Sequence, residues 1–298
     1  MSTIFTGSCV AMITPFKEDG SVDYDGLKAN IDRHVAEGTD ALLICATTGE
    51  GATLSDEEHR SVLKASAEYI DGRVPFIAGT GSNDTSYAVS LTKFAESIGA
   101  DAALVINPYY NKTTQEGIYQ HIKAVADNTN IPLIVYNVPS RTGSNILPAT
   151  IARLAKLPTV QAVKEASGDL SQIAEIIELT QDDDFDVYSG NDDQTLPIIA
   201  LGGKGVISVT ANIAPKAVHD MAMACVEDRM DEARKLFRAI NPLNRAMFYE
   251  NNPIPVKAAM KLMGLDTGAM RLPMVPMSEG AQARMVDVMK AYGGLLDD

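Results

Sequence analysis

A lysine at the end of a short apolar run is the first candidate for chemistry in this sequence. Segment 162–166 reads AVKEA, and the run that contains it predicts a β-strand. Because side chains alternate along a strand, Val160, Ala162 and Lys164 should share one face. A lysine on such a face loses hydration, which lowers the pKa of its amine and makes the neutral nucleophile available for Schiff-base formation. Taken alone, however, a strand-end lysine is more often a charge that pairs with an acid or extends to water.

The preceding apolar run carries a tyrosine and an arginine that suit the same chemistry. It ends in Tyr136 and Asn137 and is followed by VPSRTG, with Arg141 in the turn. A phenol beside the amine can relay the protons that Schiff-base formation requires. A guanidinium can bind a carboxylate through two parallel hydrogen bonds. Each residue also has a plain structural alternative, Tyr136 as a hydrogen-bonded core aromatic and Arg141 as a surface ion pair.

Hydroxyl groups follow two further apolar runs. Thr47 and Thr48 stand in TTGEG, where hydroxyls beside exposed N–H groups can hold a carboxylate or pass a proton. Tyr109 and Tyr110 stand in NPYYN, two aromatic rings with polar tips. The threonines alone also fit an ordinary turn. Both pairs therefore become candidates for one active site only if the fold brings the ends of the runs together.

The elements that would position these residues alternate between strands and helices. Eight short apolar runs predict parallel strands at 8–14, 41–46, 74–78, 102–107, 132–137, 160–165, 185–189 and 205–210. Helical patterns follow them at 23–37, 55–70, 85–98, 114–128, 148–156, 169–179 and 192–201. This rhythm predicts an α/β protein with a (β/α)8 barrel, whose active site lies at the carboxyl ends of the strands. A doubly wound sheet is the weaker alternative, because no glycine-rich dinucleotide turn follows the first run.

Only helical patterns follow after about residue 215, at 215–225, 227–247, 254–263 and 278–293. We therefore expect a catalytic barrel over residues 1–225 and a small helical extension over residues 226–298. No linker rich in Gly, Ser or Pro separates the two parts, so the extension should pack on the barrel.

Composition and missing motifs exclude several classes of protein. The 298 residues carry a net charge of −14, so neither nucleic acid nor an anionic membrane surface is an expected partner. No apolar run approaches the roughly 20 residues of a membrane span, no secretory signal is evident, and three scattered cysteines indicate a reducing compartment. We expect a cytoplasmic protein. The four histidines lack metal-ligand spacing, and neither a phosphate loop nor a GxSxG elbow occurs, so we expect no metal and no cofactor.

Several motifs together make the chain resemble a known family. They are TTGE at 47–50, GTGSN at 79–83, PYYN at 108–111, YNVPSRTG at 136–143, KEASGD at 164–169, YSGND at 188–192, GGKGVISVTAN at 202–212 and NPIPVK at 252–257. The chain resembles the dihydrodipicolinate synthase family of pyruvate-dependent aldolases, which also includes N-acetylneuraminate lyase. The resemblance covers essentially the whole chain. It implies a (β/α)8 lyase that needs no cofactor and acts in diaminopimelate and lysine biosynthesis.

The resemblance also implies a role for each catalytic candidate. Lys164 would form the Schiff base with pyruvate, and Tyr136 would donate and accept protons. Thr47 and Tyr110 would extend the proton relay, with Tyr110 entering from a neighbouring subunit. Family members form homotetramers built as pairs of dimers, so the same assembly is expected here.

Binding roles follow from the same resemblance. Thr48 and the backbone at Ile207 would hold pyruvate, and Gly190 would line the pocket. Arg141 would bind the carboxylate of the second substrate, L-aspartate 4-semialdehyde. The arginine inside SRTG favours this substrate over sugar acids, because the sugar-acid lyases of the family typically differ there.

A regulatory site known in some family members is only partly preserved. His59, Asn83 and Tyr109 match the positions that bind the inhibitor lysine. Tyr87 replaces a glutamate that would bind the ammonium of the effector, and Asp56 replaces a histidine. The sequence therefore predicts weak or absent inhibition by lysine.

Two rival interpretations remain at this stage. A related lyase acting on a 2-keto-3-deoxy sugar acid or a sialic acid would use the same lysine. A barrel without activity that only binds a small carboxylate or serves as an assembly subunit is a second rival, because a fold alone does not guarantee catalysis. The presence of all four catalytic candidates argues against the second.

Overall fold

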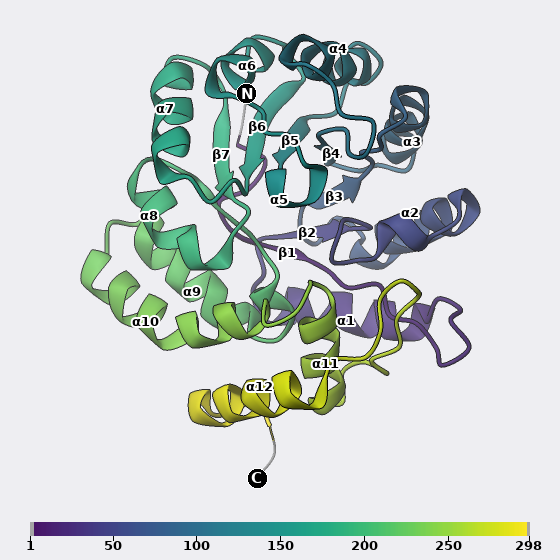
Figure 1. Ribbon diagram of the computed structural model, residues 1–298, viewed down its shortest axis with the longest axis vertical. Coiled ribbons are helices and arrows are strands. Elements are labelled where there is room, and N and C mark those ends of the chain that lie inside the picture. Colours follow the sequence, from purple (N-terminus) through teal and green to yellow (C-terminus); the bar gives the residue numbers. More distant parts are fainter. Residues whose placement is uncertain (1–2, 297–298) are drawn as a thin grey trace.

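The apolar runs of the sequence form eight parallel strands that close into one barrel (Figure 1). The computed structural model describes residues 3–296. The strands are β1 (Gly7–Ala11), β2 (Ala41–Ile44), β3 (Phe76–Gly79), β4 (Ala102–Ile106), β5 (Leu133–Asn137), β6 (Val160–Glu165), β7 (Asp186–Ser189) and β8 (Gly205–Ser208). β8 pairs with β1, which completes the ring. The predicted (β/α)8 barrel is confirmed.

Helices cover the outside of the ring, close to the predicted bounds. They are α1 (Tyr24–Ala36), α2 (Asp56–Ile70), α3 (Thr85–Ser97), α4 (Gln115–Ala126), α6 (Pro148–Leu154), α7 (Leu170–Thr180), α8 (Thr195–Ala200) and α9 (Pro215–Val226). Short helical turns that were not predicted lie on loops: α5 (Pro139–Thr142) and 3-10 helices at Gly51–Thr53 and Thr210–Asn212. A 3-10 helix at Asp192–Gln194 forms the start of the helical segment predicted at 192–201. Local chemistry sets the boundaries; for example, Ser55 and Glu58 form a capping box that starts α2.

The side chains of the strands form two apolar layers. Alternation along each strand sends small residues such as Ala11 and Ala162 inside the ring, while larger neighbours such as Val10 and Val163 pack against the helices. One prediction was wrong in this respect. Val160 packs in the outer layer, because the pairing between β5 and β6 shifts by one residue just before Ala162. Lys164 therefore shares the inner face with Ala162 but not with Val160.

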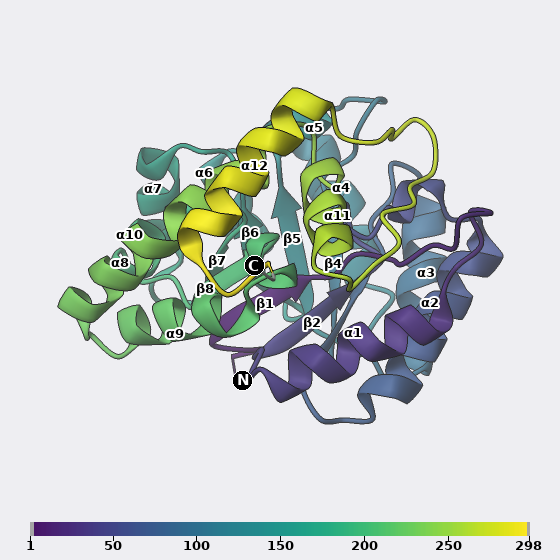
Figure 2. The same cartoon turned by 90° about the horizontal axis from the view of Figure 1, so that it is seen from below.

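The C-terminal residues add α10 (Met230–Ala246), α11 (Ile254–Leu262) and α12 (Glu279–Tyr292). The yellow-green part of Figures 1 and 2 shows α11 and α12 together on one side of the barrel. Their buried side chains belong to the same apolar cluster as those of α1 and α9, so this segment packs against the helices of the barrel. The division at residue 225 stays a prediction. Within residues 3–296, no helix is long and apolar enough to cross a membrane.

Candidate active site

Lys164 lies at the carboxyl end of β6, with its amine beneath a tyrosine ring. Its side chain is buried, and its Nζ lies 4.4 Å from the centroid of the Tyr136 ring. The two residues are register partners on adjacent strands. Burial lowers the pKa of Lys164 to about 8, although Cys9 and Asp192 act in the opposite direction. About one-tenth of this amine is therefore neutral and nucleophilic at pH 7.

Tyr136 keeps its proton under the same conditions. Burial raises the pKa of the phenol to about 12, while Arg141 and a side-chain hydrogen bond with Thr47 lower it. A neutral phenol can both donate and accept a hydrogen bond. Tyr136 thus contacts both Lys164 and Thr47 of the threonine turn, and its role in proton transfer stays a prediction.

A cavity opens onto these groups at the carboxyl ends of the strands. It measures about 660 Å³, and its lining includes Lys164, Tyr136, Thr47, Thr48, Arg141 and Gly190. These six predicted site residues come from the ends of four strands, which a barrel brings to one face. This volume suits a small-molecule site.

Arg141 lies on α5, the short helix that follows β5. Its Nη2 donates a hydrogen bond to the carbonyl oxygen of Asn252 at 3.1 Å. That contact holds the guanidinium at the wall of the cavity, where the rest of its donors suit a carboxylate. Pro139 begins α5 at the first helical position, where proline needs no hydrogen-bond partner.

Gly190 lies against Lys164 so closely that no side chain fits. An added Cβ would stand 2.8 Å from Ala166 Cβ and 3.2 Å from Lys164 Cγ. The glycine therefore gives the lysine stem the space that it needs. Ile207 is fully buried in β8 and packs inside the barrel, and its side chain is not part of the cavity lining. The role proposed for its backbone stays a prediction.

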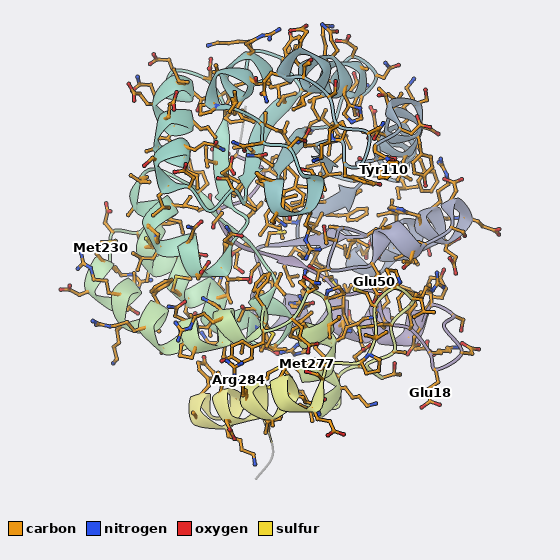
Figure 3. The ribbon with its side chains drawn as sticks, viewed as in Figure 1. Glu18, Glu50, Tyr110, Met230, Met277 and Arg284 are labelled. Atoms are coloured by element: carbon orange, nitrogen blue, oxygen red, sulfur yellow. The ribbon has the colours of Figure 1, made fainter. Side chains whose placement is uncertain are left out.

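Tyr110 is the one predicted catalytic residue that its own chain does not bring to the cavity. It lies on the loop between β4 and α4, labelled in Figure 3, and its side chain is 93% exposed. Its backbone has a φ of 68°, in the left-handed region that L residues rarely adopt. The hydroxyl is presented to the outside of this chain.

The residues matched to an effector site lie around a neighbouring cavity of about 580 Å³. Its lining includes His59, Tyr109, Asp56 and Tyr87. His59 Nε2 is hydrogen-bonded to the carbonyl of Gly79 at 2.9 Å.

In that cavity Tyr87 and Asp56 share a side-chain hydrogen bond. Asn83 is not among the lining residues, and its carbonyl accepts a hydrogen bond from Asn111 Nδ2.

Sequence reasoning assigned no role to Asn252, which the structure places in the site. Its Nδ2 donates to Thr48 Oγ1 at 3.0 Å, and its carbonyl accepts from Arg141. Asn252 precedes α11 and is 204 residues from Thr48 in the chain. The signal available was the NPIPVK motif at 252–257, which supports the resemblance without indicating a contact.

Fold and site together define a class of protein. A buried lysine amine with a lowered pKa, next to a buried phenol and an arginine at the carboxyl face of a (β/α)8 barrel, defines a Schiff-base-forming aldolase. Within residues 3–296, no group of three or more His, Cys, Asp or Glu side chains is arranged to hold a metal ion.

Comparisons with known proteins agree on one family. Residues 4–292 match the dihydrodipicolinate synthetase family, and the chain belongs to it. The 4-hydroxy-tetrahydrodipicolinate synthase of Thermoanaerobacter sp. (strain X514) is 50% identical over 291 residues, 97% of each chain. The dihydrodipicolinate synthase of Aquifex aeolicus has a TM-score of 0.96 at 44% identity, covering 99% of this chain and 100% of that one. The chloride-inhibited enzyme of Acinetobacter baumannii, solved with pyruvate, has a TM-score of 0.95 at 43% identity, covering 97% and 99%.

Proposed function

We propose that this chain condenses pyruvate with L-aspartate 4-semialdehyde through a Schiff base on Lys164, as a 4-hydroxy-tetrahydrodipicolinate synthase. The observation that carries the proposal is the buried Lys164 amine, with its pKa lowered to about 8, facing Tyr136 in a cavity of about 660 Å³. The family to which the chain belongs supports the choice of substrates.

The first half of the reaction makes the enzyme-bound imine. The neutral amine of Lys164 attacks the keto carbon of pyruvate, and its proton reaches the new alkoxide through Tyr136. The carbinolamine then loses water to give the imine, with the Tyr136 phenol returning the required proton. Thr47 shares a hydrogen bond with Tyr136 and passes the proton on. Thr48 holds the pyruvate carboxylate.

The second half forms the carbon–carbon bond. Loss of a methyl proton converts the imine to an enamine, whose terminal carbon attacks the aldehyde carbon of the second substrate. Arg141 binds the carboxylate of that substrate, which orients the aldehyde toward the enamine. Ring closure by the amino group of the second substrate then displaces the Lys164 amine and releases the cyclic product.

Borohydride reduction in the presence of pyruvate tests the covalent step. Peptide mapping should find a reduced pyruvyl adduct on Lys164, and Lys164→Ala should abolish it. Lys156→Ala is a matched control, because the Lys156 side chain is 64% exposed in a loop away from the cavity. An adduct on another lysine, or none, would refute the assignment.

Substrate comparison separates this function from the rival sugar-acid lyase. Condensation of pyruvate with L-aspartate 4-semialdehyde should exceed cleavage of sialic acid or a 2-keto-3-deoxy sugar acid. Arg141→Leu should raise KM for the semialdehyde with less effect on KM for pyruvate. A preference for a sugar acid in the wild-type protein would favour the rival.

We propose further that the active assembly is a homotetramer built from dimers in which Tyr110 enters the neighbouring site. The exposed position of Tyr110, on a loop held by the Asn111–Asn83 contact, supports this assignment. Complementation tests it. Inactive Tyr110→Phe and Lys164→Ala subunits should regain activity when mixed, because one site of each mixed dimer then holds both intact residues. No recovery in verified mixed assemblies would contradict it.

We also propose that lysine inhibits this enzyme weakly or not at all. Tyr87 and Asp56 share a side-chain hydrogen bond in the lining of the cavity that would hold the effector. Tyr87 stands where the sensitive pattern has a glutamate, and Asp56 stands where it has a histidine. An inhibition curve in the coupled assay checks this. A half-inhibiting concentration well below millimolar would contradict it.

A further inference from the structure

A buried ion pair joins the C-terminal segment to the turn that carries the two active-site threonines. Lys257 of α11 and Glu50 lie 2.6 Å apart, Nζ to Oε1, and their side chains are 0% and 2% exposed. The residues are 207 positions apart in the chain. Moving two charges out of water is costly, and an apolar pair of similar volume often stabilises a fold at least as well. Stability alone therefore does not explain why a buried ion pair occurs at this position.

The polar atoms of this pair are held from several sides. Glu50 Oε2 accepts the backbone N–H of Arg271 at 3.1 Å. Lys257 Nζ donates a second hydrogen bond to the carbonyl of Ala269 at 2.8 Å and lies 4.3 Å from the centroid of the Phe16 ring. Neither side chain can move without breaking more than one contact. Figure 3 labels Glu50 on the side of the barrel nearest the C-terminal segment.

The backbone of Glu50 is also part of the turn 47–50. Its N–H donates to the carbonyl of Thr47 at 3.1 Å, which closes the turn 47–50. Its backbone has a φ of 51°, in the left-handed region that residues other than glycine rarely adopt. Such a conformation persists when the surroundings hold it from several directions. Here Thr14 Oγ1 binds the carbonyl of Gly49 at 2.6 Å, and the carboxylate of Glu50 is fixed by Lys257.

We propose that the Lys257–Glu50 ion pair is a positioning device that holds the turn 47–50 so that its two threonine hydroxyls face the reacting groups. The inference rests on the proposed function of Lys164. Thr47 must keep its hydrogen bond with Tyr136, and Thr48 is held from the same segment by Asn252. A misplacement on the order of 1 Å can cost about 10²-fold in rate. Lys257 is thus a positioning residue that lies outside the predicted barrel segment and touches no substrate.

The double variant Glu50→Gln/Lys257→Met tests the proposal. It removes both charges at nearly constant volume, so no single buried charge is left unpaired. We expect a folded protein whose kcat is lower by about 10- to 100-fold, while borohydride still traps pyruvate on Lys164 at saturating pyruvate. Lys156→Met is the control. It breaks an ion pair with Asp183 in the loops before β6 and β7, at 2.7 Å with side chains 64% and 15% exposed, and should leave kcat unchanged.

The outcomes separate positioning from structural support. A folded double variant with wild-type kcat and KM would overturn the proposal, since a purely structural pair changes the melting temperature but not the rate of each folded molecule. If the double variant does not fold, Lys257→Met alone decides by the same criterion, because it removes the contact to Glu50 while the carboxylate keeps its hydrogen bond from the backbone N–H of Arg271. Failure to trap pyruvate on Lys164 in the wild-type protein would instead refute the proposed function.

Discussion

Between about pH 6 and pH 10, kcat/KM for pyruvate should follow the deprotonation of the Lys164 amine in the free enzyme. Burial lowers the pKa of this amine from 10.5 to about 8. At pH 7 about one-tenth of the enzyme then holds the neutral nucleophile, roughly 300 times the fraction expected for an ordinary lysine. The difference corresponds to roughly 3 kcal/mol of preference for the neutral form in the folded protein.

Between about pH 6 and pH 10, the plot of kcat/KM against pH should show a single transition. The rate constant should rise about tenfold per pH unit below pH 7.5 and level off above about pH 8.5. No fall from ionisation of Tyr136 is expected below pH 10, because burial raises the pKa of that phenol to about 12. A coupled assay at limiting pyruvate measures the profile. A transition centred near 10.5, or a flat profile, would refute the view that desolvation activates this lysine.

The variant Tyr136→Phe tests, in the same assay, whether the measured pKa belongs to Lys164. The groups that set the pKa of Lys164 after burial are Cys9, Asp192 and Arg141, and the Tyr136 hydroxyl is not among them. The midpoint of the pH transition should therefore stay near pH 8, while kcat/KM is lower than in the wild type at every pH. If the midpoint shifted in Tyr136→Phe, the measured pKa would belong to a coupled pair of groups and not to the lysine alone.

Three substitutions should give distinct outcomes in kinetic, trapping and stability measurements. Tyr136→Phe should still form the borohydride-trapped adduct but lower kcat by roughly 10²-fold or more, so an unchanged kcat would contradict the relay. Gly190→Ala should slow adduct formation and destabilise the fold by about 1–3 kcal/mol in urea titrations, because the new Cβ would stand 2.8 Å from Ala166 Cβ. Gly280→Ala, where a Cβ meets nothing within 4 Å, is its control. Lys164→Met should stabilise the protein by up to about 3 kcal/mol below pH 8, where the folded wild type carries a buried ammonium, and this gain should vanish as pH rises toward 10.5.

The barrel and the contact between Tyr136 and Lys164 could be predicted because both depend on local patterns. Each apolar run was long enough and regular enough to indicate a strand, and the βα rhythm then put the ends of the strands on one face. Tyr136 and Lys164 end consecutive runs, so their contact follows from strand order. Val160 was misplaced because a bulge depends on how two strands pair, and the sequence of one strand does not reveal it.

The contacts made by the C-terminal segment could not be predicted in the same way. Asn252 reaches Thr48 and Arg141, and Lys257 reaches Glu50, across more than 100 residues in each case. No periodicity links such positions, because their contact depends on how α11 packs back over the barrel. The NPIPVK motif at 252–257 supported the resemblance, but only the fold shows which residues its side chains contact.

The two apolar layers explain how one barrel can hold a buried amine. The outer layer, between strands and helices, contains large side chains such as Val163 and Leu133, whose burial stabilises the fold. The inner layer contains many alanines, Ala162 among them, which leave room for the stem of Lys164. Because the two layers occupy opposite faces of each strand, a lysine can replace an inner residue at the strand end without opening a gap in the outer one. Packing of the outer layer therefore offsets the cost of desolvating the lysine, and the same desolvation lowers the pKa of its amine.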